Sequence, residues 1–122
     1  MSLRSMVRAA LASTDDVVAD EERTAAALVT GCRPLDDLNP RERSSAAGVL
    51  RSVVLRPREN VPTVEAELYD GTGTLHLVWL GRREIAGIQP GRRLRVEGMV
   101  TVREGRRTMY NPRYELRARA GE

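Results

Sequence analysis

The stretch YDGTGTLHLVWLG, residues 69–81, is the most regularly patterned part of the chain. Its Asp-Gly-Thr-Gly segment, residues 70–73, is typical of a tight turn, because glycine reaches the left-handed backbone conformations that turns require. Apolar and polar residues alternate on both sides of this turn, as they do in strands with one buried face. The stretch therefore predicts a β-hairpin in which Asp70 accepts hydrogen bonds from the backbone of its own turn.

The same alternation assigns a face to each side chain of the hairpin, because successive residues of a strand point to opposite sides of a sheet. Trp79 falls on the apolar face, so we expect it in the core rather than against a ligand. The residues predicted to face inward are Val64, Ala66, Leu68, Leu75, Leu77 and Trp79. Those predicted to face outward are Glu65, Glu67, Tyr69, His76 and Val78.

Further strands are predicted at 44–58, 92–103 and 108–119, where apolar and β-branched residues recur. Gly48 and Gly98 suit bends within long strands, and Asn111-Pro112 should interrupt the last one, because proline donates no ladder hydrogen bond. Residues 81–91 are long enough for one or two helical turns. The residues of the fourth strand predicted to face inward are Leu94, Val96, Val100 and Val102.

The order of these elements is three strands, a short helix and two more strands. It predicts a mainly β fold, a five-stranded OB-fold Greek-key barrel with the short helix between strands three and four, preceded by an N-terminal helix. We therefore expect a helical leader and connector over residues 1–40 and an OB-fold domain over residues 41–120.

Residues 14–30 of the leader are flanked by residues that are typical of the start and the end of a helix. Ser13 or Thr14 can cap it, acidic residues fill its first turns, and Gly31 can end it. Residues 3–12 either form a short helix of their own or stay disordered. Because Val17, Val18 and Leu28 fall roughly on one face, we expect this helix to pack on the barrel or on another chain.

Charge is unevenly distributed along the 122 residues, and all twenty basic residues are Arg. Residues 1–40 carry a net charge of −3 and residues 41–122 a net charge of +6, which together give the formal +3. A basic domain behind an acidic leader favours an anionic partner, although a solvated charged surface would look the same. The lone Cys32 forms no internal disulfide, which fits a cytoplasmic protein, and no apolar run approaches a membrane span.

Three segments together resemble a known family: LYDGTGTLHLVW (68–79), IQPGRRLRVEGMV (88–100) and EGRRTMYNPRYEL (104–116). They are similar to the OB-fold nucleic-acid-binding domains of the tRNA-anticodon and helicase type, and most similar to the wedge domain of RecG helicase. Small actinobacterial proteins carry such a domain alone behind a short helical leader. The likeness covers residues 44–117, and it includes none of the helicase motor motifs.

The resemblance implies binding of single-stranded or branched nucleic acid on the outward side of the second and third strands and on the flanking loops. On that face, Tyr69 and His76 can stack on bases and Arg51 can pair with phosphate. Glu65 and Glu67 repel phosphate there, but carboxylates can accept a hydrogen bond from the amino group of cytosine or bind a basic protein. The remaining candidates are Arg56, Arg58, Arg103, Arg106 and Arg107 in the loops, and Tyr114 as an exposed contact.

These observations lead to one expected function and one alternative. We expect a DNA-binding, possibly RNA-binding, protein of repair or recombination that uses arginine–phosphate pairing and aromatic stacking. The alternative is a protein-interaction module that binds a partner or self-associates through the barrel face and the acidic helix. No catalytic residue, metal site or cofactor is expected, because the sequence has no triad-like context, no metal-ligand spacing and no phosphate-binding loop.

The charge asymmetry adds a hypothesis about the leader. The acidic residues of the helix at 14–30 could fold over the arginines of the barrel and mask them from a polyanion.

Overall fold

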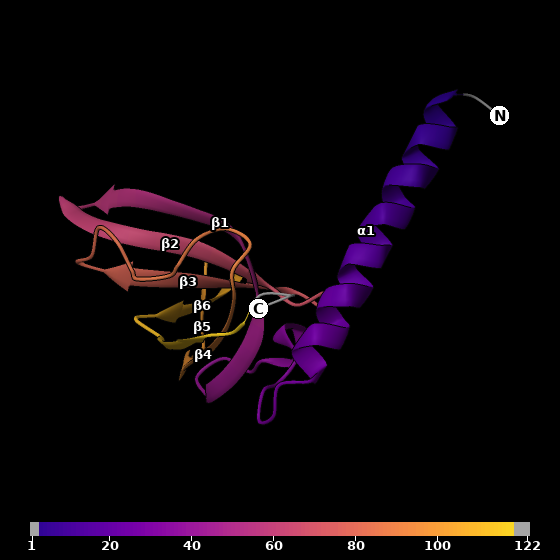
Figure 1. Cartoon of the computed structure of the whole chain (residues 1–122). Coiled ribbons are helices and arrows are strands. Elements are labelled where there is room, and N and C mark those ends of the chain that lie inside the picture. Colours follow the sequence, from indigo (N-terminus) through magenta and orange to yellow (C-terminus); the bar gives the residue numbers. More distant parts are fainter. Residues whose placement is uncertain (1–2, 119–122) are drawn as a thin grey trace.

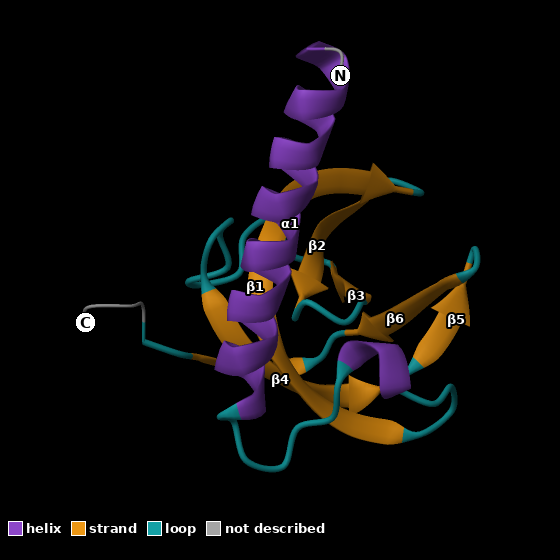
Figure 2. Ribbon diagram, turned by 90° about the vertical axis from the view of Figure 1, so that its right-hand side faces the viewer, coloured by secondary structure: helices purple, strands orange, loops and turns teal. Residues whose placement is uncertain are grey.

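The structure, a computed structural model, describes residues 3–118, with side chains from residue 15 onward (Figure 1). A long helix lies at one end of a curled β-sheet, and it extends well past the sheet (Figures 1 and 2). The elements in chain order are α1 (Leu3–Ala27), a 3-10 turn η1 (Leu35–Asp37), β1 (Arg43–Arg58), β2 (Val61–Tyr69), β3 (Thr74–Leu80), β4 (Arg93–Met99), β5 (Thr101–Arg103), β6 (Arg106–Tyr110) and β7 (Arg113–Leu116).

The seven strands form one sheet in the order β5-β6-β3-β2-β1-β4-β7. All neighbours are antiparallel except β3 and β6, which run parallel. Only Val100 separates β4 from β5, and these two strands lie near opposite ends of the sheet order. The run from Arg93 to Arg103 thus connects the two sides of the sheet and curls it into a barrel.

Two of the five expected strands are each broken into two, so the sheet has seven strands. At Val100 the backbone leaves the ladder to pair with the connector: its N–H donates to the carbonyl of Glu42, and its carbonyl accepts from the N–H of Arg41. At Asn111 and Pro112 the last strand switches partners, from β3 to β4.

The Asn111-Pro112 break has a specific structure. Asn111 has a left-handed φ of 50°, and its side-chain oxygen accepts from the N–H of Leu80 at 2.9 Å. The carbonyl of Pro112 accepts from Trp79 Nε1 at 3.1 Å. The interruption predicted at this proline is therefore confirmed, and side-chain hydrogen bonds replace the ladder bonds that it removes.

The short helix expected between the third and fourth strands is not formed. Residues 81–92 make a series of turns, with φ values of 77° at Gly87 and 86° at Gly91. Such left-handed residues are incompatible with continuous right-handed helix. Ile85 and Ile88 are nevertheless buried, so this segment is fixed on the core by its apolar side chains.

The core confirms most of the predicted inward positions. Trp79 is 5% exposed, and every predicted core residue of the 69–81 hairpin is buried. Val102 is an exception, because β5 lies beyond the break and leaves this side chain 50% exposed. The buried cluster comprises Leu35, Leu38, Ala46, Leu50, Val64, Ala66, Leu68, Leu75, Leu77, Trp79, Ile85, Ile88, Leu94, Val96, Val100 and Met109.

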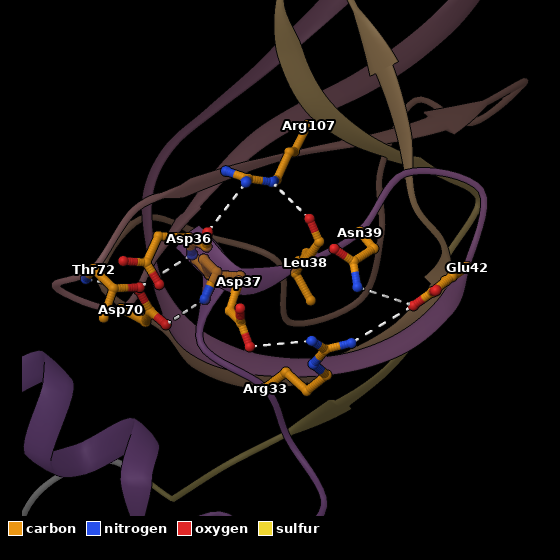
Figure 3. A network of polar contacts seen from close by, with 10 residues as sticks. Arg33, Asp36, Asp37, Leu38, Asn39, Glu42, Asp70, Thr72 and Arg107 are labelled. Atoms are coloured by element: carbon orange, nitrogen blue, oxygen red, sulfur yellow. Dashed lines mark hydrogen bonds and ion pairs between the residues drawn. The ribbon is translucent and has the colours of Figure 1, made fainter.

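The connector before β1 contributes Leu35 and Leu38 to this core, and a polar network holds it in place (Figure 3). The N–H of Leu35 donates to Asp70 Oδ2 at 2.9 Å. Arg107 donates from Nε to the carbonyl of Leu38 at 3.0 Å and from Nη2 to that of Asp36 at 3.1 Å. The connector thus packs against the barrel and forms part of its core.

β1 is long because it pairs with two strands in succession, first with β4 and then with β2. The change of partner falls at Val49, next to Gly48, where a side chain would meet the carbonyl of Tyr69. The register then shifts at Arg51, which is the extra residue of a β-bulge. Close approach of two backbones therefore accounts for the glycine at position 48.

Helix α1 begins at Leu3, well before the expected cap at residues 13–14, and ends at Ala27. It meets the barrel where Gly71 packs against the backbone of Ala19, and where Glu22 accepts from Arg93 Nη2 at 3.0 Å. The valines do not pack on the barrel, and they are exposed, Val17 by 55% and Val18 by 42%. A small residue and one ion pair, rather than an apolar stripe, make the contact.

This contact predicts a difference between two glycine substitutions. Gly71 and Gly91 have nearly the same φ, 87° and 86°, but only Gly71 has the helix against its Cα. Gly91→Ala should cost about 1 kcal/mol of unfolding free energy through backbone strain alone. Gly71→Ala should cost about 2 kcal/mol more, because the added methyl group meets the carbonyl of Ala19.

Urea unfolding of both variants measures the difference. Equal losses in the two variants would mean that α1 does not rest on the β2–β3 turn.

Candidate functional site

Two tight turns stand at the end of the barrel opposite α1 (Figure 1). The β1–β2 turn has Glu59 and Asn60 at its centre, with φ values of 50° and 66°, and the β5–β6 turn has Glu104 and Gly105, at 52° and 75°. Positive φ at both central residues is the geometry of the type I′ hairpin, which matches the twist of the flanking strands. The loops predicted to carry arginines are therefore short and built into hairpins.

These turns bring together residues that the sequence separates widely. A small hollow is lined by Arg58 of β1, Arg103 of β5 and Arg106 of β6, together with Glu65, His76 and Glu104. The hollow adjoins a larger cleft of about 400 Å³, since His76 and Arg106 line both. The cleft is lined by Pro40, Glu67, Thr74, His76, Val102, Gly105, Arg106 and Arg107.

Glu65 is not on the surface as its strand position predicted. Its side chain is 3% exposed, it accepts from Arg58 Nε at 3.0 Å, and its other oxygen forms an ion pair with Arg56, whose Nε lies 3.1 Å away. His76 Nε2 lies 3.5 Å from the carboxylate. The side chains of the β1–β2 hairpin close over Glu65, because its tip supplies two guanidinium groups that can replace water around the carboxylate.

Burial raises the pKa of Glu65, but the hydrogen bonds and charges of Arg58 and His76 outweigh it, so the net pKa lies below the ordinary 4.5. The carboxylate is therefore ionised in the folded protein. Two guanidinium groups surround one carboxylate here, and the cluster keeps a positive balance. The repulsion of phosphate expected from Glu65 is thus cancelled inside the protein.

Glu67 has the opposite environment. It is half-buried and lines the cleft, and no described side chain lies within hydrogen-bond or ion-pair distance of its carboxylate. The two outward glutamates of β2 differ because the arginine-bearing hairpin tip reaches only the first of them. Alternation along the strand predicts the same outward position for both glutamates, so no local feature of the sequence distinguishes them.

The other predicted arginines fall into two groups. Arg103 donates to the hydroxyl of Tyr110, and Arg106 is exposed, with Glu104 no nearer than 3.9 Å. Arg107 is instead held on the carbonyls of the connector, so its guanidinium forms a fixed wall of the cleft. Arg103 and Arg106 are the basic groups presented to solvent, and Arg107 has mainly a structural position.

Arg51 and Tyr69 form a stacked pair further along the same face. The guanidinium carbon of Arg51 lies 3.5 Å from the centroid of the Tyr69 ring, which is a cation–π contact. The bulge at Arg51 turns this side chain onto the neighbouring strand. Tyr69 is therefore covered on one side by its own protein, and the planar group facing outward is the guanidinium.

Tyr114 does not have the exposed position expected of it. Its ring packs edge-on against Trp79, with centroids 5.9 Å apart, and its hydroxyl donates to the carbonyl of Ala86 at 2.7 Å. Pro112 is buried and directs the following strand back onto the core. Tyr114 therefore belongs to the packing of the barrel.

The acidic helix does not mask the arginines of the two turns. In the part of α1 whose side chains are described, Glu22 pairs with Arg93 and Asp20 with Arg23. A separate hollow lies between α1 and the barrel, and it shares no lining residue with the cleft. The masking hypothesis is wrong for these arginines, because the helix docks at the other end of the barrel (Figure 1).

Within 3–118, no group of three or more His, Cys, Asp or Glu side chains is placed to hold a metal ion. No helix in the same range is long and apolar enough to cross a membrane.

Comparison with known proteins identifies the fold. No family model and no curated protein matches the chain. Among solved structures, RecG bound to a three-way DNA junction matches with 24% identity and a TM-score of 0.59, over 74% of this chain and 13% of that one. A Replication Protein A heterotrimer bound to single-stranded DNA matches with 18% identity and a TM-score of 0.49, over 63% of this chain and 58% of that one.

The chain thus spans about an eighth of the RecG chain and somewhat over half of the Replication Protein A chain. At this identity the likeness establishes the fold. The chain has an OB-type β-barrel similar to that in RecG, as the resemblance of its motifs predicted.

The buried carboxylate predicts a pH-dependent contribution to stability. Folding lowers the pKa of Glu65, so its ionised carboxylate stabilises the folded protein at pH values above the ordinary pKa. This stabilisation is lost as the pH falls through the pKa of the folded state. At pH 7, Glu65→Gln should lower the free energy of unfolding by about 1–3 kcal/mol, since Arg56 and Arg58 lose their charged partner. The deficit should shrink between pH 7 and pH 3, because protonation of the folded carboxylate begins only as the pH falls below its ordinary range.

Urea titrations at the two pH values measure this, with the exposed Glu115→Gln as the matched control. A deficit that is the same at both pH values would show that the charge of Glu65 is not what stabilises the hairpin tip.

Proposed function

We propose that this protein binds nucleic acid in the cleft beside its β5–β6 turn and in the adjoining hollow between this turn and the end of β1. The observation that carries the proposal is the convergence of Arg58, Arg103 and Arg106 around His76. Guanidinium groups around the hollow and along the adjoining cleft outnumber the carboxylates there, so the two together form a positively charged groove suited to a phosphate backbone. We propose binding rather than catalysis, and the net charge of +6 over residues 41–122 supports a polyanionic ligand.

The shape of the face favours single-stranded or branched nucleic acid over a regular duplex. Planar groups lie along it, namely His76 in the cleft and the Arg51–Tyr69 pair beyond. Such groups stack on the faces of bases, which are accessible only where bases are unpaired. The RecG structure, whose barrel is similar, is bound to a three-way DNA junction, which supports a role in DNA repair or recombination.

Removal of the two exposed arginines should weaken binding in a way that depends on salt. Each lost phosphate contact should reduce the slope of log affinity against log salt by about 0.7 on single strands, so Arg103→Ala with Arg106→Ala should reduce it by about 1.4. The measurement is a fluorescence anisotropy titration of labelled single-stranded DNA, RNA, duplex and three-way junction at several salt concentrations.

Two single substitutions serve as controls, Arg113→Ala and Arg82→Ala, which remove exposed arginines outside the cleft lining. No binding of any probe at low salt and tens of micromolar protein would refute the proposal. So would an equal loss of slope per arginine in the control variants.

One observation favours a second function, self-association through α1. The N-terminal half of this helix extends away from the barrel (Figures 1 and 2). Isolated helices are marginally stable in water, and most helices in proteins depend on packing of an apolar face. Val17 and Val18 are exposed on α1, so a second copy of the chain would supply that packing.

Self-association predicts a dimer in sedimentation velocity at micromolar concentration. Val17→Glu with Val18→Glu should convert it to a monomer, whereas Met99→Glu, on an exposed apolar side chain of the barrel, should not. A monomer in the unmodified chain would exclude this second function.

A further inference from the structure

Glu67 lines the cleft, and its carboxylate is a hydrogen-bond acceptor that no described side chain uses. Glu65, two residues earlier, is nearly fully buried and surrounded by Arg56, Arg58 and His76. Glu67 lines the cleft with no described partner for its carboxylate. An ionised carboxylate accepts hydrogen bonds at both oxygens and donates none. A ligand in the cleft therefore meets a group that favours neighbouring N–H donors and repels oxygen or nitrogen lone pairs.

The rest of the cleft lining has a different character. Pro40 and Val102 supply apolar walls, and Arg106 and Arg107 supply positive charge. Arg107 is fixed by its two hydrogen bonds to the connector carbonyls, so its guanidinium group does not pair with the Glu67 carboxylate. A volume of about 400 Å³ lies toward the small end of ligand sites, and it accommodates a nucleobase with part of its sugar.

This arrangement suits a nucleotide in a particular orientation. Its base would lie between the apolar walls with donor groups toward Glu67, and its phosphate would lie toward Arg106. A carboxylate among arginines weakens binding of a bare polyanion, because it opposes the charge of the rim. It contributes favourably only when the ligand donates hydrogen bonds to it, so it acts as a selector among bases.

The bases differ in the donors that they present on the edge used for pairing. Guanine presents two adjacent donors, a ring N–H and an amino group, which match the two oxygens of a carboxylate. Adenine and cytosine present an amino group beside a ring nitrogen that accepts, and thymine and uracil present one N–H between two carbonyl oxygens. The acceptors in the last four lie against the carboxylate and are repelled.

We infer that the cleft is a base-specific subsite that prefers an unpaired guanine, recognised by Glu67. The inference rests on the proposed function, because it assigns base selectivity to the same cleft. Good bidentate contacts to a base discriminate by about tenfold or more against the wrong base, and a similar preference is expected here.

The test compares labelled oligothymidylates of about 15 nucleotides, a length within the range that single OB folds cover. The central residue is dT, dC, dA, dG or deoxyinosine, and the full chain is titrated with each by fluorescence anisotropy. A single guanine per strand prevents the formation of guanine quadruplexes. Deoxyinosine keeps the ring N–H but lacks the amino group, so it should bind between dG and dT.

Glu67→Gln should remove the preference for dG, because the amide presents one acceptor beside a donor and no longer matches the two adjacent donors of guanine. The same variant should bind the all-thymidine strand more tightly than the original protein does, since a negative charge leaves the cleft. Glu115→Gln changes the net charge equally but lies outside the cleft lining, and it should keep the preference.

The outcomes separate this inference from the proposed function. Equal binding of all five strands by the original protein would overturn the guanine subsite and leave nucleic-acid binding intact. Binding of none of them would overturn both. A preference for dG that persists in Glu67→Gln, with thermal unfolding confirming that the variant is folded, would show that Glu67 does not recognise the base.

Discussion

The buried carboxylate of Asp70 is the interaction on which the arrangement of this protein depends. One oxygen closes the β2–β3 turn by accepting from the N–H of Thr72 and of Gly73, and the other accepts from the N–H of Leu35. A single side chain therefore fixes both the turn and the connector (Figure 3). The connector then places two leucines in the core and Pro40 on the cleft, while the turn presents Gly71 to the helix.

Two acidic side chains of β2 are used in contrasting ways. Glu65 is buried and ionised among arginines and stabilises the hairpin tip, whereas Glu67 is left without a protein partner at the cleft. The two glutamates differ because the arginines of the β1–β2 tip lie over Glu65 and not over Glu67. A carboxylate that is neutralised internally does not oppose an anionic ligand, and one that is not neutralised can select what binds.

The helix and the arginine-bearing turns lie at opposite ends of the barrel. The helix occupies the end formed by the β2–β3 turn, and the arginine-bearing turns form the other (Figure 1). Because docking of the helix uses Gly71 and the Glu22–Arg93 pair, the described acidic side chains of the helix cover none of the turn arginines. The two hairpin turns are tight, so their guanidinium groups are held on strands rather than on mobile loops.

The sequence by itself determined the strands, the inward positions of the 69–81 hairpin, the self-bonded Asp70 turn and the break at Asn111-Pro112, because alternation, glycine and proline act locally. The OB fold followed from the order of the strands together with the resemblance. Only the tertiary structure decided that Glu65 is buried, that Tyr114 packs on Trp79, that Arg107 holds the connector and that residues 81–92 form turns. Each of these depends on which distant segment arrives beside a residue, and periodicity carries no information about that contact.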